Sequence, residues 1–136
     1  MYDVNLVAVV VAVVASMAVG FAWYSPQLFG KQWMSLMGLS EDKMAAAKKE
    51  MGKMYALSFV GALIMGYVLG MVVKMAYSTT VVGGMKVGFG VWLGFIAPVQ
   101  LTDTIFSGKK WNLLYLNSGY QLVSTMVMGA VLVLMG

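Results

Sequence analysis

Residues 4–24 read VNLVAVVVAVVASMAVGFAWY and contain no charged side chain. A helix needs about 20 apolar residues to cross the hydrocarbon core of a bilayer, so this run predicts a transmembrane span. No Lys or Arg precedes it, so the basic region of a secretion signal is missing and we expect the span to be retained. It ends at Trp23 and Tyr24, which are typical of the membrane–water interface.

Three further segments, at about residues 54–75, 83–106 and 111–135, are also long and apolar. Hydrophobic residues make up 61% of the 136 positions and charged residues only 10%, whereas soluble domains typically carry about 25% charged residues. Only helices and closed barrels satisfy every backbone polar group inside a bilayer. We therefore predict an all-α membrane protein with four transmembrane helices, forming a single domain over residues 1–136.

The connector at residues 25–53 is polar and rich in lysine. Residues 25–26 (SP) are typical of a helix N-cap followed by a first helical residue, and Phe29 and Trp33 then recur at helical spacing. This pattern predicts a short helix lying in the interface. From about residue 41 we expect a cytoplasmic extension of the second transmembrane helix. The predicted interfacial aromatic residues are Trp23, Tyr24, Phe29, Trp33 and Trp111.

Lysines are distributed unevenly between the two sides of the membrane. The connectors after the first and third spans contain Lys31, Lys43, Lys48, Lys49, Lys53, Lys109 and Lys110, whereas the connector after the second span has only Lys74 and Lys86. By the positive-inside rule the lysine-rich connectors are cytoplasmic and both termini are extracytoplasmic. Because the lysines lie beside apolar spans, their expected partner is the lipid bilayer and not nucleic acid.

Small residues recur every four positions in several spans. Such stripes let helix backbones approach closely, because lipid provides no hydrophobic force between helices. In the third span Gly84 and Gly88 interleave with Gly90 and Gly94, which puts glycine on two faces and suits a helix between two neighbours. These stripes offer more close-packing surface than one bundle uses, so we expect a homo-oligomer. The predicted packing residues are Ala8, Ala12, Ser16, Gly20, Gly66, Gly70, Gly90 and Gly94.

The densest polar stretch inside a span follows Pro98, which lacks an amide hydrogen, clashes with the carbonyl of Gly94 and predicts a kink. A tight turn joins the third and fourth spans, so antiparallel pairing should bring Gln100 near Ser118. We therefore predict an intramembrane polar site, with polar groups satisfying one another. Its candidate residues are Gln100, Thr102, Asp103, Thr104, Tyr115, Asn117 and Gln121.

Asp103 is the only carboxylate within a predicted span, and intramembrane acids often mark proton or ion pathways. It lies about one turn from the cytoplasmic end, where it can instead pair with Lys109 or Lys110. The ion pair is the simpler of these two interpretations.

Histidine and cysteine are both absent from the sequence. Their absence removes the thiolate nucleophile, the usual zinc and haem ligands, and the commonest proton-transfer base. An enzyme that used Asp103 and Tyr115 on a lipid substrate would need a second acid or base, and we find none in the sequence. We therefore expect no metal site, no cofactor and no enzymatic activity.

Several short runs carry a resemblance to a known family. They are residues 20–26 (GFAWYSP), 28–33 (LFGKQW), 91–95 (VWLGF), 106–109 (FSGK) and 117–120 (NSGY). Together they are similar to the bacterial membrane family catalogued as domain of unknown function 1761. The resemblance implies the four-span fold and a bacterial inner membrane, and it carries no catalytic residues.

Two functions fit these observations. The first is a structural or assembly-type membrane protein that acts as a homo-oligomer. The alternative is a small transporter or channel whose polar path lies near Pro98 to Asp103, for an unknown small molecule or ion. A water-accessible path lined by Gln100 or Asn117 would favour transport, whereas a dry seam of small residues would favour assembly.

Overall fold

The computed structural model describes residues 4–25, 27–37 and 51–135, and in that part of the chain it contains helices and no strands. Four helices are long and apolar enough to cross a membrane, namely Leu6–Trp23, Gly52–Met75, Val81–Ser107 and Trp111–Met135. The predicted all-α fold with four potential transmembrane helices is therefore confirmed.

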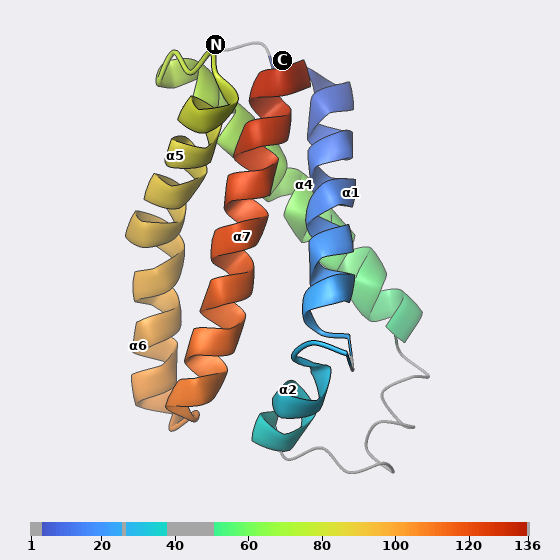
Figure 1. The fold of residues 1–136 in the computed structure, drawn as a ribbon, viewed down its shortest axis with the longest axis vertical. Helices are drawn as coiled ribbons and strands as arrows, with labels where there is room; N and C mark the ends of the chain where they lie inside the picture. Colours follow the sequence, from blue (N-terminus) through green and yellow to red (C-terminus); the bar gives the residue numbers. More distant parts are fainter. Residues whose placement is uncertain (1–3, 26, 38–50, 136) are drawn as a thin grey trace.

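The helix α7 (Trp111–Met135) lies at the centre of the bundle (Figure 1). It packs most extensively against α5 (Val81–Val91) on one side and against α1 (Leu6–Trp23) on the other. The helix α4 (Met51–Met75) crosses behind them and packs mainly on α1. This arrangement makes α7 the element through which the other spans are connected.

The core lies where α1, α4 and α7 meet. Its apolar side chains are almost fully buried, while many other large apolar side chains face outward, where lipid would surround them. Ser16, Ser124 and Thr125 are buried with them. The core residues are Ala8, Val9, Ala12, Val13, Leu69, Met128 and Leu132.

Two pairs of residues set how closely α5 approaches α7. A Cβ atom added to Gly84 would overlap the carbonyl oxygen of Gly129, and one added to Gly88 would overlap the carbonyl oxygen of Thr125. Only glycine permits such contact between helix backbones. Gly84 and Gly88 therefore allow the backbones of α5 and α7 to lie in contact.

The beginning of the first span also meets the end of the last span. The Asn5 side chain caps α1 by accepting hydrogen bonds from the amides of Val7 and Ala8, and its Nδ2 donates to the Met135 carbonyl at 2.9 Å. The beginning of α1 and the end of α7 thus lie at the same end of the bundle (Figure 1).

The helix α2 (Gly30–Met37) is the expected short helix after the first span, at the other end of the bundle (Figure 1). It begins later than the sequence suggested. Ser25 does not cap it: its hydroxyl donates to the Ala22 carbonyl, and its own carbonyl accepts from the amides of Leu28 and Gly30. A tight turn therefore precedes the helix. The predicted extension of the second span over residues 41–50 lies outside the described residues.

The third span has an irregular middle. Between α5 and α6 (Ala97–Ser107) lies the π-helix η1 (Trp92–Ile96), and the Ala97 amide donates to the carbonyl of Trp92 five residues earlier. Pro98, the predicted kink residue, is the second residue after this segment. A π-turn inserts one extra residue into the helix. This extra residue helps the helix to accommodate the proline ring, which would otherwise clash with the carbonyl one turn earlier.

Candidate functional site

The end of α1 is attached to the second turn of α7 by two side-chain hydrogen bonds. The indole Nε1 of Trp23 donates to the Leu116 carbonyl at 3.0 Å, and the hydroxyl of Tyr24 donates to Oδ1 of Asn117 at 2.6 Å. All of these groups are at least partly buried, where a polar atom without a partner is costly. The two aromatic side chains predicted to lie at the interface therefore also hold the bundle together.

Tyr120 extends this contact along α7. Its hydroxyl lies 3.4 Å from the Ser16 carbonyl and against the Cα of Gly20, and its ring packs edge-on against Tyr24 with 5.4 Å between ring centroids. Tyr24 also packs edge-on against Trp33 of α2, at 5.9 Å. Edge-to-face pairs of this kind are favourable beyond the area they bury.

Trp92 reaches α7 from the opposite side. Its indole Nε1 donates to the backbone carbonyl of Ser118 at 2.9 Å and lies 3.2 Å from the Ser118 hydroxyl. Because Trp92 is also the first residue of η1, the irregular part of the third span is connected to the same turn of α7 as α1.

Four consecutive residues of α7 thus each contact a different partner. Asn117 accepts from Tyr24, Ser118 accepts from Trp92, and Tyr120 packs on α1. Gly119 faces the Trp23 ring, because a Cβ atom added to Gly119 would lie 3.1 Å from that ring. We call these residues with their partners the aromatic cluster. It consists of Trp23, Tyr24, Trp92, Asn117, Ser118, Gly119 and Tyr120.

A cavity of about 340 Å³ opens beside the aromatic cluster, between α1, α4 and α7. Its wall carries the side chains of Tyr24, Tyr55 and Tyr120, together with Ser16 and Ser58. These groups make the cavity partly polar although it lies among membrane-spanning helices. They provide hydroxyl groups for hydrogen bonding and no carboxylate.

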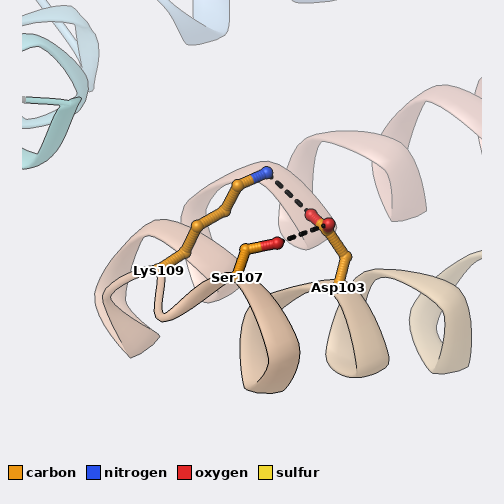
Figure 2. Close-up of polar contacts among 3 residues, drawn as sticks. All are labelled: Asp103, Ser107 and Lys109. Atoms are coloured by element: carbon orange, nitrogen blue, oxygen red, sulfur yellow. Dashed lines mark hydrogen bonds and ion pairs between the residues drawn. The ribbon is translucent and has the colours of Figure 1, made fainter.

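The polar residues predicted as one buried network are divided in the structure. Asp103 is about half exposed, and its carboxylate forms an ion pair with Lys109 at 2.7 Å and accepts a 2.9 Å hydrogen bond from Ser107 (Figure 2). The Thr102 hydroxyl donates to the Pro98 carbonyl at 3.0 Å within its own helix. The structure thus contains the ion pair that was the simpler interpretation of Asp103. Asp103 is not part of the predicted buried network, because the end of α6 leaves it within reach of the lysine in the following turn.

The remaining candidates lie in different surroundings. Thr104 is buried, whereas Tyr115 is 67% exposed. The Gln100 side-chain oxygen is buried without a hydrogen-bond partner among the described residues, so it accepts no bond from Ser118, near which it was expected to lie. The Gln121 carbonyl accepts from the Thr125 hydroxyl at 2.9 Å. Of the candidates, Asn117 alone belongs to the aromatic cluster.

The polar residues predicted from the sequence did not include Trp92, Ser118, Gly119 or Tyr120. Trp92 and Tyr120 could have been recognised from the sequence, because an indole N–H or a tyrosine hydroxyl in the middle of a span needs a hydrogen-bond partner. Within residues 4–25, 27–37 and 51–135, no group of three or more His, Cys, Asp or Glu side chains could hold a metal ion.

The family described as "Protein of unknown function (DUF1761)" matches residues 7–133, which is nearly the whole chain. No curated protein and no solved structure matches the chain. The runs that resemble this family, residues 20–26, 91–95 and 117–120, supply the side chains of the aromatic cluster. The chain belongs to the DUF1761 family.

Proposed function

We propose that this protein is a structural, assembly-type membrane protein that acts as a homo-oligomer and has no enzymatic activity. One observation carries the proposal. Gly90 and Gly94 are exposed on the third span, with no atom within 4 Å of a Cβ built on either of them. Two glycines four residues apart let a second helix backbone approach closely in lipid.

The other predicted packing residues are already used within the chain. Ala8, Ala12 and Ser16 are buried in the bundle. Cβ atoms on Gly20, Gly66 and Gly70 would meet side chains of the same chain within 3.2 Å. Gly90 and Gly94 differ from these other small residues. No contact among the described residues of a single chain requires a small residue at either position.

The direction of these two glycines follows from helix geometry. Gly84 and Gly88 lie against α7, and Gly90, two residues after Gly88, points about 200° further around the helix. It thus faces away from the bundle. Phe89 and Leu93 are 43% and 54% exposed beside it, so the glycines lie next to large apolar side chains that a second copy would cover. We call Phe89, Gly90, Leu93 and Gly94 the glycine face.

The experiment is to replace Gly90 and Gly94 by leucine and to measure the association state in lipid nanodiscs or by single-molecule photobleaching. The proposal expects Gly90→Leu and Gly94→Leu to shift the protein toward the monomer. Gly61→Leu is the matched control, because Gly61 on α4 is equally exposed with no atom near its Cβ. A wild-type monomer, or the same shift in all three variants, would contradict the proposal.

We further propose that the protein lies in a bacterial inner membrane with both termini outside the cytoplasm. The turn between α6 and α7 lies at the end of the bundle that contains α2, and the turn between α4 and α5 lies at the other end (Figure 1). Among the described residues, the segments after the first and third spans contain Lys31, Lys53, Lys109 and Lys110, and those around the turn between α4 and α5 contain Lys74 and Lys86. The positive-inside rule assigns the first end to the cytoplasm. A reporter fused after the last residue should be active only outside the cytoplasm, and cytoplasmic activity would reverse the assignment.

A second function is supported by Gln100. An amide oxygen that is buried in a span without a partner is costly, and polar groups of this kind often mark a path for an ion or a small molecule. We therefore keep a small transporter or channel near Pro98 to Asp103 as the alternative. This alternative predicts that wild-type protein carries an ion flux across the membrane of proteoliposomes. Gln100→Leu should abolish this flux. Absence of flux of protons, sodium and potassium from wild-type proteoliposomes would count against it.

A further inference from the structure

A second cavity lies at the end of the bundle that contains α2. It is a cleft of about 530 Å³ between α2 and the first turns of α7, a volume within the usual range of small-molecule sites. One wall carries Gln32 and Ser35 from α2, and the opposite wall carries Asn112 and Tyr115 from α7. The two walls of the cleft therefore come from helices that are far apart in sequence and lie side by side only in the folded protein.

The bounds of the spans place the cleft where lipid headgroups are expected. Trp23, which ends the first span, and Leu116, in the second turn of the fourth span, also line it. The cleft thus begins where the first span ends and the fourth begins. A ligand held there would have its polar part at the membrane surface and its apolar part along the bilayer.

The chemistry of the lining is that of an amphiphile site. Gln32 and Asn112 provide side-chain amide donors, and Ser35 and Tyr115 provide hydroxyl groups, all of which can donate to phosphate or glycerol oxygens. Phe29 and Leu36 form an apolar part that a water-soluble phosphate could not use. Among the residues that the structure describes, no acidic residue lines the cleft.

Charge at this end favours a negative ligand. The first turn of α7 contains no acidic residue, and the positive end of the helix dipole lies beside Asn112. Lys31 neighbours Gln32 on α2, and Lys110 directly precedes α7. Lysines near a membrane surface attract anionic lipid.

We propose that the cleft between α2 and α7 binds the headgroup of one anionic phospholipid, with the amides and hydroxyls holding the phosphate and the glycerol moiety. Its acyl chains would leave along Phe29 and Leu116 toward the bilayer. The site requires only a single chain, so it stands whether or not the protein assembles through the glycine face.

The test uses the full-length protein in nanodiscs of phosphatidylcholine with a minor fraction of phosphatidylglycerol. A photoreactive phosphatidylglycerol carrying a diazirine near the glycerol backbone is cross-linked, and labelled peptides are identified by mass spectrometry. A phosphatidylcholine analogue with the same diazirine measures labelling that does not depend on the headgroup. Free glycerol phosphate is added as a competitor, to separate a lipid site from a site for a soluble anion.

The proposal expects labelling of residues in α2 and the first turns of α7, with the anionic analogue preferred by about fivefold, the preference that one lysine near a membrane surface can provide. Ser35→Trp, which fills the cleft, and the double variant of Gln32→Leu with Asn112→Leu should each reduce this labelling to the level of the phosphatidylcholine analogue. Gln27→Leu is the matched control, because Gln27 is exposed and outside the cleft, and it should label like the wild type.

Three results would overturn the proposal. The first is equal labelling by the two analogues. The second is unchanged labelling in Ser35→Trp, a variant whose exposed position leaves the core intact. The third is loss of labelling on addition of glycerol phosphate, which would assign the cleft to a soluble anion.

Discussion

The hydroxyl of Tyr24 lies 2.6 Å from Oδ1 of Asn117, although 93 residues separate the two in sequence. Tyr24 is the first residue beyond α1, and Asn117 lies in the second turn of α7. This bond fixes the end of the first span to the fourth. It therefore also places α2, which begins six residues after Tyr24, beside the first turns of α7.

Tyr24→Phe tests whether this contact stabilises the fold. The variant keeps the ring and its packing against Trp33 and Tyr120 but removes the donor to Asn117. Measured hydrogen bonds between membrane helices average about 0.6 kcal/mol and reach about 1.7 kcal/mol, so a loss in this range is expected in the free energy of unfolding. Unfolding in mixed micelles with increasing dodecyl sulfate measures it.

The control is Tyr115→Phe, since the side chain of Tyr115 is 67% exposed. It should change the free energy of unfolding by less than Tyr24→Phe. Equal losses would mean that the Tyr24 hydroxyl contributes nothing specific.

Gly84→Ala should be much more damaging than Gly61→Ala. The added Cβ of Gly84→Ala overlaps the Gly129 carbonyl, so α5 must move away from α7, and forcing extra atoms into a packed interface costs about 1–3 kcal/mol. At Gly61 the Cβ meets no atom within 4 Å, and alanine is the better helix former by about 1 kcal/mol. Thermal unfolding of both variants in one detergent gives the comparison, and similar stabilities would disprove the close approach of α5 and α7.

The sequence was sufficient to predict the four spans. Only a helix satisfies its own backbone in lipid, so an uncharged run such as residues 4–24 has few alternative structures. The same reasoning predicted that Trp23 and Tyr24 are interfacial. It did not identify their partners, because the register of α1 against α7 depends on contacts between distant residues, such as Gly20 with Tyr120.

Periodicity also showed that the third span has glycine on two faces, but it could not show which face meets the same chain. In the structure Gly84 and Gly88 meet α7, while Gly90 and Gly94 meet nothing in the described residues. Both pairs have the same spacing, so only the position of a neighbouring helix distinguishes them. The start of α2 was missed for a related reason, because the turn after Ser25 is held by backbone hydrogen bonds that the side chains do not reveal.

The ion pair between Asp103 and Lys109 should contribute little to stability. Both side chains are about half exposed, and exposed pairs are weakened by solvent and salt. We expect Asp103→Asn and Lys109→Gln, alone and combined, to unfold at nearly the same dodecyl sulfate fraction as the wild type. The small coupling free energy between Asp103 and Lys109 should vanish at high salt. A large loss that persists at high salt would indicate that Asp103 has a buried role after all.

The proposed assembly through the glycine face is tested most directly by disulfide cross-linking in native membranes, because the chain contains no cysteine of its own. Gly94→Cys places one thiol on that face, and Gly61→Cys places one on an equally open position of α4. After oxidation, Gly94→Cys should give a covalent dimer and Gly61→Cys should remain monomeric. No dimer from Gly94→Cys, or equal dimer from both variants, would contradict assembly through Gly90 and Gly94.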